Sequence, residues 1–465
     1  MLLTSRYVIP VSSAFNTYIE YGAVLVEGDR IVEVGTAADL MARHPGEEVR
    51  DFGMAAIMPG FVDCHSHLEF SLMRGILNDT PYASWKAFIN EKMALLTIKD
   101  WFDSAYIGAY EALTAGITCV ADVTSTGACL PAIAELGLRG IVYRSVGAPA
   151  RKQVEEEMGR AVEQIGQWRG QVADTDRIQI GIAPENLFSC HPQILKEVAD
   201  FANATGTPVA MHLAGSQEEC DFIRYGSSVF SIANDSSDHQ AFAPRQSVEL
   251  LPAGCTPVQY ALNWDILDVP QLLAVHCVKL EDHDIELLRD HGVSVAVTPR
   301  ACAKLGQGLA RIPEMRRAGI AVGLGSDSPA ASDSMDPIAE MRFAMLALRA
   351  THGKDGFIEG PDMIRMATLD SARALGLDDL VGSLDPGKKA DIIAIDLSDS
   401  RQAPTHFPTS AVVHTSSRDD VMMTMVDGNI VYDAADKFCQ VPNADTHEMR
   451  RITQSLETVR RRLRS

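Results

Sequence analysis

The sequence lacks an apolar run long enough to cross a membrane. A membrane-spanning helix needs about 20 consecutive apolar residues, and no stretch of this 465-residue chain approaches that length. The first residues, MLLTSRYVIPVSSAF, also lack the basic start, apolar centre and small-residue cleavage site of a secretory signal. We therefore expect a cytoplasmic protein without a membrane partner.

Paired cysteines are missing as well. The nine cysteines are scattered, and none of them forms a C-x-x-C pair. In a chain without an export signal, such cysteines are expected as reduced thiols in the core. This pattern argues against a disulfide framework and against a cysteine-ligated zinc site.

Basic residues are scarce relative to acidic ones. The chain has 41 Lys and Arg against 62 Asp and Glu, which gives a net charge of −21. A surface of this charge repels phosphate backbones, so we expect no nucleic-acid partner. The hydrophobic fraction of 46% is that of an ordinary globular protein, and the length suits one large barrel with an accessory domain.

The middle of the chain alternates short apolar, β-branched runs with longer amphipathic segments. Eight runs are typical of strands: the run into His65, followed by residues 116–123, 140–147, 178–184, 208–214, 272–278, 293–299 and 320–327. Several intervening segments end in Gly, a common helix C-cap. Strands that alternate with helices pair in parallel, and eight such units predict an α/β fold with a closed (β/α)8 TIM barrel.

The two ends of the chain have a different pattern. Residues 1–57 and 382–435 contain short strand-like runs separated by Gly and Asp turns, and neither end is long enough for a core of its own. We predict that they pack together as one small β-sandwich, which leaves residues 58–381 for the barrel. Residues 436–465 read as a basic C-terminal helix that is solvated, packed on the protein or in contact with another subunit.

Five side chains of the metal-ligand type stand at the ends of predicted strands. His65 and His67 close the first strand, His212 ends the fifth, His276 lies near the end of the sixth and Asp327 ends the eighth. The C-terminal ends of parallel barrel strands meet at one mouth, and residues i and i+2 of a strand share a face. Each residue alone has an ordinary explanation, such as a helix N-cap for Asp327. Imidazoles with one carboxylate suit divalent ions such as zinc or iron, so the joint pattern predicts a metal site.

Several motifs resemble the amidohydrolase superfamily, in its cytosine-deaminase-like and chlorohydrolase-like branch. The matching segments are MPGFVDCHSHLEFSLMRG, MHLAGSQEE, LLAVHCVKL, TPRACAKLGQG, GLGSDSPAASDSMD and VGSLDPGKKADIIAID. The variants HSHLEFS, HLAGSQEE and LGQGLARI look most similar to aminodeoxyfutalosine deaminases and related nucleoside deaminases. Triazine hydrolases and pterin deaminases are similar to a lesser degree.

This resemblance implies one divalent metal ion held by His65, His67, His212 and Asp327. Zinc is favoured, with iron or manganese as alternatives. His276 would lie beside the metal-bound water and polarise the substrate, and Asp327 would accept a proton as the water attacks a ring carbon that carries an amino group. The adduct would then expel ammonia. The family also favours homodimers or larger homo-oligomers.

Three segments depart from the family pattern. The branch reads H-x-x-E after the fifth strand, where the glutamate protonates a ring nitrogen, but this chain has Gly215 at that position. Glu218 and Glu219 follow, and we interpret them as the solvated start of the next helix. At the end of the fourth strand, Glu185 replaces a histidine that contacts the substrate. It either supplies the missing acid or is a surface loop residue.

The third departure follows the seventh strand. Ala301 and Cys302 stand where relatives often have Ser-Asn. We interpret all three departures as altered pocket positions, which predicts a substrate that differs from those of similar family members.

The segment after the first strand holds further candidates for substrate binding. Glu69, Arg74 and Trp85 fall in a loop that covers the substrate in relatives. Trp85 could stack on a heterocycle or pack in the core, and Arg74 could bind an anionic group or form a structural ion pair. Residues 224–254 are long for a loop at the barrel mouth and typical of a lid, in which His239 is either a substrate contact or exposed.

These observations predict a metal-dependent hydrolytic deaminase of an aminated nitrogen heterocycle, of the purine or nucleoside, pterin, pyrimidine or triazine type. One alternative is a hydrolase of the same fold that expels chloride, a thiol or an alkylamine, or opens a cyclic amide. A second is a homologue that lost catalysis with Gly215 and only binds a ligand. The intact ligand set argues against the second alternative.

Overall fold

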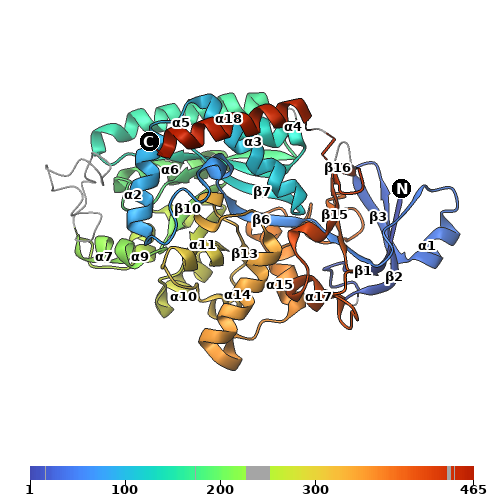
Figure 1. The fold of residues 1–465 in the computed structure, drawn as a ribbon. Coiled ribbons are helices and arrows are strands. Elements are labelled where there is room, and N and C mark those ends of the chain that lie inside the picture. The colour runs from blue at the N-terminus through green and yellow to red at the C-terminus, as the bar shows by residue number, and fades with distance from the viewer. Residues whose placement is uncertain are drawn as a thin grey trace.

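Two eight-stranded sheets organise the chain. The structure is a computed structural model that describes residues 1–15, 17–172, 174–226, 252–436, 441–442, 444 and 446–464. One sheet lies within a ring of helices, and the other, formed by the two ends of the chain, lies beside it (Figure 1).

The first of these sheets is a parallel barrel whose strands follow chain order. The strands are β6 (Phe61–Ser66), β7 (Ile117–Thr124), β8 (Arg139–Val146), β9 (Ile178–Pro184), β10 (Val209–Leu213), β11 (Leu272–His276), β12 (Ser294–Val297) and β13 (Val322–Leu324). All eight predicted strands are thus confirmed, with bounds that differ by a few residues. Most of their residues are buried, which explains the near-continuous apolar runs in the sequence.

The barrel closes between its first and last strands. Ser66 and Asp327 form a parallel bridge, and the amide of Asp327 donates to the carbonyl of His65 at 2.8 Å. The carboxylate of Asp63 also accepts hydrogen bonds from the amide of Ser326, at 2.9 Å, and from its hydroxyl. Closure therefore fixes the backbones of His65 and Asp327 next to each other.

Helices surround the barrel (Figure 1). They are α3 (Ile98–Thr114), α4 (Cys129–Leu136), α5 (Arg151–Gln171), α6 (Pro192–Thr205), α7 (Gln217–Tyr225), α9 (Pro257–Asn263), α10 (Asp282–Asp290), α11 (Pro299–Lys304), α12 (Ile312–Arg317), α14 (Pro337–His352), α15 (Gly360–Met366) and α16 (Leu369–Ala374). Gly137, Gly206 and Gly226 end α4, α6 and α7 in the left-handed conformation, as expected from the glycines in the sequence.

Short elements and one long helix complete the barrel region. They are η1 (Leu68–Met73), α2 (Tyr82–Met93), η2 (Ile266–Asp268), α13 (Pro329–Ser332), η3 (Gly353–Gly356) and α18 (Thr446–Arg464). The basic helix α18 packs on α3, where Arg451 lies 3.2 Å from Asp103 and Arg462 lies 2.5 Å from Asp100. The structure therefore favours the packed interpretation of this helix.

The second sheet combines both ends of the chain, as predicted. Its order is β16-β15-β14-β5-β1-β2-β3, with β4 paired to β1, so that the strands form one continuous mixed sheet. The strands are β1 (Leu2–Val8), β2 (Ile19–Glu27), β3 (Arg30–Thr36), β4 (Val49–Asp51), β5 (Ala55–Pro59), β14 (Ile392–Asp396), β15 (Val421–Val426) and β16 (Asn429–Asp433), accompanied by α1 (Ala37–Arg43), α17 (Pro408–His414) and η4 (Arg418–Asp420). The antiparallel pair of β5 and β14 joins the N-terminal and C-terminal segments.

A buried arginine links the barrel to this second sheet. Arg139 begins β8, at the end of the barrel opposite its mouth, and only 1% of its surface is exposed. Its guanidinium contacts both oxygens of Asp391, at 2.9 and 3.1 Å, and also the carboxylate of Asp427. The carbonyl of Asp176 accepts a further hydrogen bond at 3.0 Å.

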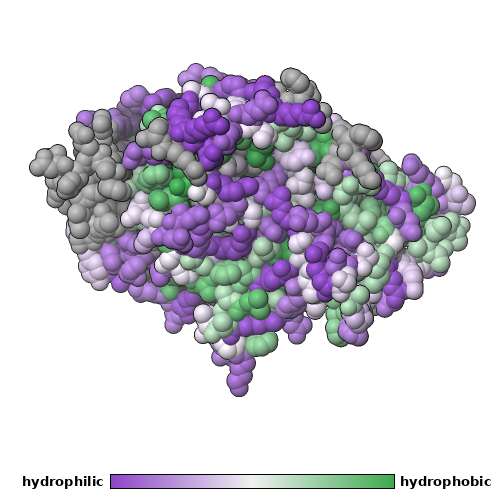
Figure 2. Space-filling model, in the orientation of Figure 1, coloured by the Kyte–Doolittle hydropathy of each residue, from purple (hydrophilic) through white to green (hydrophobic). Residues whose placement is uncertain are grey.

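The face of the molecule drawn in Figure 2 is mainly polar. Figure 2 shows hydrophilic side chains over most of the visible face, most densely along α18, with apolar side chains in small separate patches. Among the described residues, no helix combines the length and apolar character needed to span a bilayer.

Candidate active site

Four histidines and one aspartate come together at the mouth of the barrel. They stand at or just after the ends of β6, β10, β11 and β13. The ligand-type atoms of His65, His67 and Asp327 lie within 4.8 Å of one another, as do those of His65, His212 and His276. The Nε2 atoms of His65 and His212 are 3.2 Å apart. The structure thus brings together all five residues that the strand pattern singled out.

Backbone carbonyls set the tautomers of two of these histidines. His67 Nδ1 lies 2.9 Å from the carbonyl of Val123, and His212 Nδ1 lies 2.6 Å from the carbonyl of Glu185. Because a carbonyl only accepts, each Nδ1 carries the hydrogen and each Nε2 keeps its lone pair. Histidines that bind metals are commonly held in this way.

The donor set fits a divalent metal ion. Burial lowers the pKa of His65, His67 and His276 well below the usual value and that of His212 to about 4, so these imidazoles are neutral. The Nε2 lone pair of His212 lies 3.2 Å from Nε2 of His65. Nδ1 of His65 is buried and has no hydrogen-bond partner among the described residues, so no protein group holds the ring nitrogens of His65 away from an ion. Asp327 accepts the amide of Ser328 with Oδ1 at 2.6 Å, which leaves its other oxygen for the ion.

Two buried aspartates hold the ligands in place. Asp63 accepts the amide of His65 at 3.2 Å, in addition to its bonds to Ser326 across the closing strands. Asp122, in β7, accepts the amide of Leu68 at 2.7 Å and so fixes the chain just beyond His67. Sequence reasoning missed both residues. The available signal was an aspartate inside an otherwise apolar strand, in FVDCHS and VADVT.

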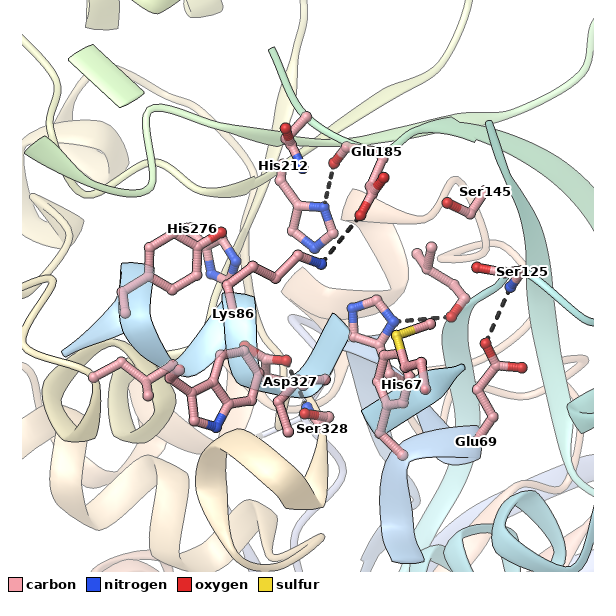
Figure 3. Close-up of a pocket in the computed structure, with 18 of the residues that line it drawn as sticks. His67, Glu69, Lys86, Ser125, Ser145, Glu185, His212, His276, Asp327 and Ser328 are labelled. Carbon is pink, nitrogen blue, oxygen red and sulfur yellow. Dashed lines mark hydrogen bonds and ion pairs between the residues drawn. The ribbon is translucent and has the colours of Figure 1, made fainter. Parts of the chain in front are cut away.

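A cavity opens over the histidines at the barrel mouth (Figure 3). One wall comes from α2, whose residues Tyr82, Trp85, Lys86, Ile89 and Met93 all line the cavity. Their spacing of three and four positions places them on one face of the helix. Lys86 is the single charged side chain of this face.

Glu185, at the end of β9, lies in the cavity rather than in a surface loop. Its Oε1 accepts a hydrogen bond from Lys86 Nζ at 3.1 Å, and its Oε2 accepts one from the hydroxyl of Ser189 at 3.3 Å. The ammonium of Lys86 lowers the pKa of Glu185. The carboxylate is therefore ionised and accepts at both oxygens, whereas a direct acid would need to carry a proton.

Lys86 was not identified from the sequence. Figure 3 shows its side chain running across the cavity, with the ammonium between His212 and His67. Burial lowers the pKa of His67 and His212 and raises that of Asp327 to about 7; the charge of Lys86 adds to the first two shifts and opposes the third. Its signal in the sequence was a lone lysine in the apolar stretch SWKAFI.

Glu69 and Trp85 both line the cavity, and each is also held by the protein. Burial raises the pKa of Glu69, whose carboxylate accepts the hydroxyls of Thr124 and Thr126 at 2.7 Å and the amide of Ser125 at 3.1 Å. Trp85 is 7% exposed and packs in the apolar cluster beneath the mouth. The structure thus supports core packing for Trp85, and stacking on a heterocycle stays a prediction.

Two groups of predicted pocket residues lie elsewhere. Arg74 does not line the cavity and pairs with Glu111, which is the structural ion pair that the sequence allowed as an alternative. Ala301 and Cys302 are buried at the start of α11 and do not line this cavity either. Cys302 Sγ instead lies behind His276, 3.6 Å from its Nδ1. The view of these two positions as pocket residues was wrong, because the helix turns them into the core.

The interpretation of Glu219 as a solvated residue was also wrong. Its side chain is buried and accepts the amides of Ala214 at 3.2 Å and Gly215 at 2.9 Å. Burial raises the pKa of Glu219 to about 7. Glu218 is half-buried, and His239 lies outside the described residues.

Gly215 leaves space beside His276. A Cβ atom at this position would lie 3.2 Å from Cδ2 of His276 and 3.6 Å from Nε2 of Gln307, and both of these residues line the cavity. A longer side chain at Gly215 would therefore project toward the cavity. No described carboxylate takes that place, because Glu219 is bonded to the backbone and does not line the cavity.

Comparison with known proteins identifies the family. The model of the Amidohydrolase family matches residues 56–431, and that of the Imidazolonepropionase-like composite domain of bacteria matches residues 22–46. The 5-methylthioadenosine/S-adenosylhomocysteine deaminase of Pelotomaculum thermopropionicum is 31% identical over 437 residues, which are 92% of this chain and 91% of that protein. The enzyme of the same name from Symbiobacterium thermophilum is 30% identical over 438 residues, 93% of each chain.

Solved structures agree with this assignment. An adenosine deaminase from Xanthomonas campestris with bound zinc superimposes with a TM-score of 0.84 at 25% identity, covering 100% of this chain and 98% of that one. The atrazine chlorohydrolase of Arthrobacter aurescens, complexed with zinc, shares the fold with a TM-score of 0.81 at 22% identity, covering 99% of both chains. The predicted TIM barrel is confirmed, and the chain belongs to the amidohydrolase family.

Proposed function

We propose that this protein is a metal-dependent hydrolytic deaminase of an aminated nitrogen heterocycle. The observation that carries the proposal is the group of neutral histidines and Asp327 beneath a cavity with an aromatic wall. The relatives named as deaminases of adenosine-type compounds support it and favour a purine nucleoside among the predicted substrate classes.

We propose His65, His67, His212 and Asp327 as the metal ligands and zinc as the metal. The zinc in the adenosine deaminase and chlorohydrolase structures supports zinc over iron or manganese. When bound, a divalent ion would lower the pKa of a water molecule toward neutrality and so supply hydroxide.

The side chains divide the remaining work. The carboxylate of Asp327 accepts the proton of the attacking water and passes it to the amino nitrogen that leaves as ammonia. His276, held at Nδ1 by the hydroxyl of Thr298 at 2.8 Å, polarises the substrate beside the attacked carbon. Trp85 packs against the ring, and Glu69 contacts a polar edge of the substrate.

Glu185 takes part in replacing the carboxylate that is missing at Gly215, as an ionised partner and not as the acid itself. Its place in the cavity and its carbonyl bond to His212 support this role. Glu185→Gln is expected to lower turnover about 100-fold or more and to spare metal binding, since the ligand set stays intact. Normal turnover by this variant would remove Glu185 from the mechanism.

The proposed setting is a cytoplasmic homodimer or larger homo-oligomer that binds a small molecule and no nucleic acid or membrane. The net charge of −21 supports the absence of a nucleic-acid partner. Light scattering on the purified protein measures the oligomeric state.

The decisive experiment is ammonia release by zinc-loaded and iron-loaded protein from adenosine derivatives, aminopurines, aminopterins, cytosines and aminotriazines. Ammonia, together with a product that carries oxygen in place of the amino group, would support the proposal. A His212→Asn variant, which loses one ligand, serves as the inactive control. If protein with confirmed bound metal released no ammonia from any of these compounds, the proposed function would be contradicted.

One alternative keeps a specific observation in its favour. Because Gly215 provides no acid, a substrate that expels chloride or a thiolate needs less proton transfer from the protein than one that expels ammonia or an alkylamine. Mass spectrometry of the products separates this alternative from deamination.

A further inference from the structure

We propose that Lys86 protonates the ring nitrogen of the substrate and that Glu185 positions Lys86 for this step. The inference rests on the proposed function and assigns its missing acid to a specific atom. Lys86 lies outside all the motifs that resemble the family.

The need for this group follows from the chemistry of deamination. Water adds to the ring carbon that carries the amino group, and the electron pair of the ring C=N bond moves onto the ring nitrogen. That nitrogen is a poor site for negative charge unless it is protonated as the bond forms. At Gly215, where the family places a carboxylic acid, this chain has no side chain, and the neighbouring Glu219 is bonded to the backbone.

The bonds between Lys86 and Glu185 show which of the two can donate. Both carboxylate oxygens of Glu185 already accept, one from Lys86 and one from Ser189. An ammonium has three N–H donors. Within the part of the chain that the structure describes, Glu185 is the acceptor of one of them, so two remain for a ligand in the cavity.

The position of Lys86 is unfavourable for a purely structural residue. Its neighbours on the cavity face of α2 are Tyr82, Trp85, Ile89 and Met93, which form an apolar wall. The ammonium lies among the histidines that hold the metal, where it repels a divalent cation (Figure 3). If the residue at position 86 served only to pack in this wall, an apolar side chain would be expected there. A role of Lys86 at the reacting atoms explains its positive charge.

The proposed step balances as follows in protons and electrons. A C–O bond forms between the water and the ring carbon, the C=N electron pair moves to the ring nitrogen, and that nitrogen takes a proton from Lys86 Nζ and keeps it in the product. Asp327 passes the first water proton to the amino nitrogen, the C–N bond breaks and ammonia leaves. The remaining hydroxyl proton is released as the carbonyl forms, and Lys86 regains a proton from solvent. Glu185 stays ionised throughout.

The test replaces Lys86 and returns an amine from solution. With the nucleoside that releases ammonia most rapidly, Lys86→Ala is expected to lower kcat about 100-fold or more, the usual contribution of a general acid, and to change KM only a few-fold. Added propylamine is expected to restore part of kcat, and more acidic amines of similar size should restore more. Metal content is measured in every variant.

A matched control lies on the same helix. Lys92 approaches Glu91 at 3.9 Å and does not line the cavity, so Lys92→Ala removes the same charge from α2 and should keep kcat within about twofold of the wild type. The positioning role of Glu185 is tested by the double variant. Lys86→Ala with Glu185→Gln should be no slower than Lys86→Ala alone, because Glu185 acts through Lys86.

The outcomes separate the two proposals. An unchanged kcat in Lys86→Ala, a change confined to KM, or a loss that no amine restores would overturn the role of Lys86 while leaving deamination intact. Multiplied losses in the double variant would overturn the positioning role of Glu185. Absence of ammonia from the metal-loaded wild type would instead overturn the proposed function, and this step with it.

Discussion

Replacing Gly215 with alanine is expected to stabilise the protein slightly and to slow its turnover. The φ angle of Gly215 lies outside the left-handed region, so alanine fits its backbone. Without strain, substitutions of this kind stabilise proteins by about 0.4–1 kcal/mol, because they reduce the freedom of the unfolded chain. The displacement of His276 offsets part of this gain, which leaves only a slight net stabilisation. Stability and activity should therefore move in opposite directions.

The cost in activity arises at His276. The new Cβ would lie 3.2 Å from Cδ2 and 3.5 Å from Cβ of His276, so the imidazole must retreat by a few tenths of an ångström. The hydrogen bond from His276 to Thr298 at 2.8 Å opposes this movement. Since a misplacement of about 1 Å can cost roughly 100-fold in rate, a shift of this size should lower kcat about three- to tenfold.

Urea unfolding and steady-state ammonia release measure the two effects. Gly166→Ala is the matched control, because Gly166 lies in α5 with no atom within 4 Å of its added Cβ. It should stabilise the protein by about 0.5–1 kcal/mol and leave kcat unchanged. If Gly215→Ala kept kcat within about twofold, the space beside His276 would not be sensitive, and our account of this position would be wrong.

Two further predictions concern buried charges away from the mouth. Arg139→Met should lower the free energy of unfolding by about 3–5 kcal/mol, because Asp391 loses its cation and Asp427 keeps only Lys389, at 3.7 Å. Asp391→Asn in the same chain should recover part of the loss. Urea unfolding followed by fluorescence and by circular dichroism measures both variants, and a loss below about 1 kcal/mol would contradict the prediction. Burial raises the pKa of Glu340 from 4.5 to about 8, so its contribution to stability is complete below pH 4.5 and is lost as the pH rises through 8. Glu340→Gln stays neutral at both pH values. Its melting temperature should therefore fall less between pH 5 and pH 8 than that of the wild type, and an equal fall in both proteins would refute this account.

The strands and the candidate metal-ligand residues were accessible from sequence for a physical reason. Strands buried on both faces require continuous apolar runs, and parallel strands must present their C-terminal ends at one mouth. A histidine or an aspartate at such an end, as in His212 and Asp327, is therefore visible without knowledge of the contacts between helices. The packing of the two chain ends against each other could also be predicted, because neither end is long enough to bury a core alone.

The orientation of side chains on the loops and helices at the mouth was not accessible. Glu219 follows a helix N-cap, where the same sequence allows the carboxylate to face solvent or to turn back onto the amides of Ala214 and Gly215. The position of Lys86 depends on the rotation of α2 over the cavity, which a sequence of 12 residues does not specify. Cys302 differs from Lys86 in that its helix, α11, turns it away from the cavity and behind His276.

The closing contact between β6 and β13 has a consequence for the order of folding. The bonds between Asp63 and Ser326 join residues 263 positions apart, so this junction has one of the longest loops to close and forms late. His65 and Asp327 meet only when the first and last strands meet. A partly folded chain therefore cannot assemble the complete proposed ligand set, and an opening confined to this junction would dismantle the proposed metal centre while the remaining strands stay paired.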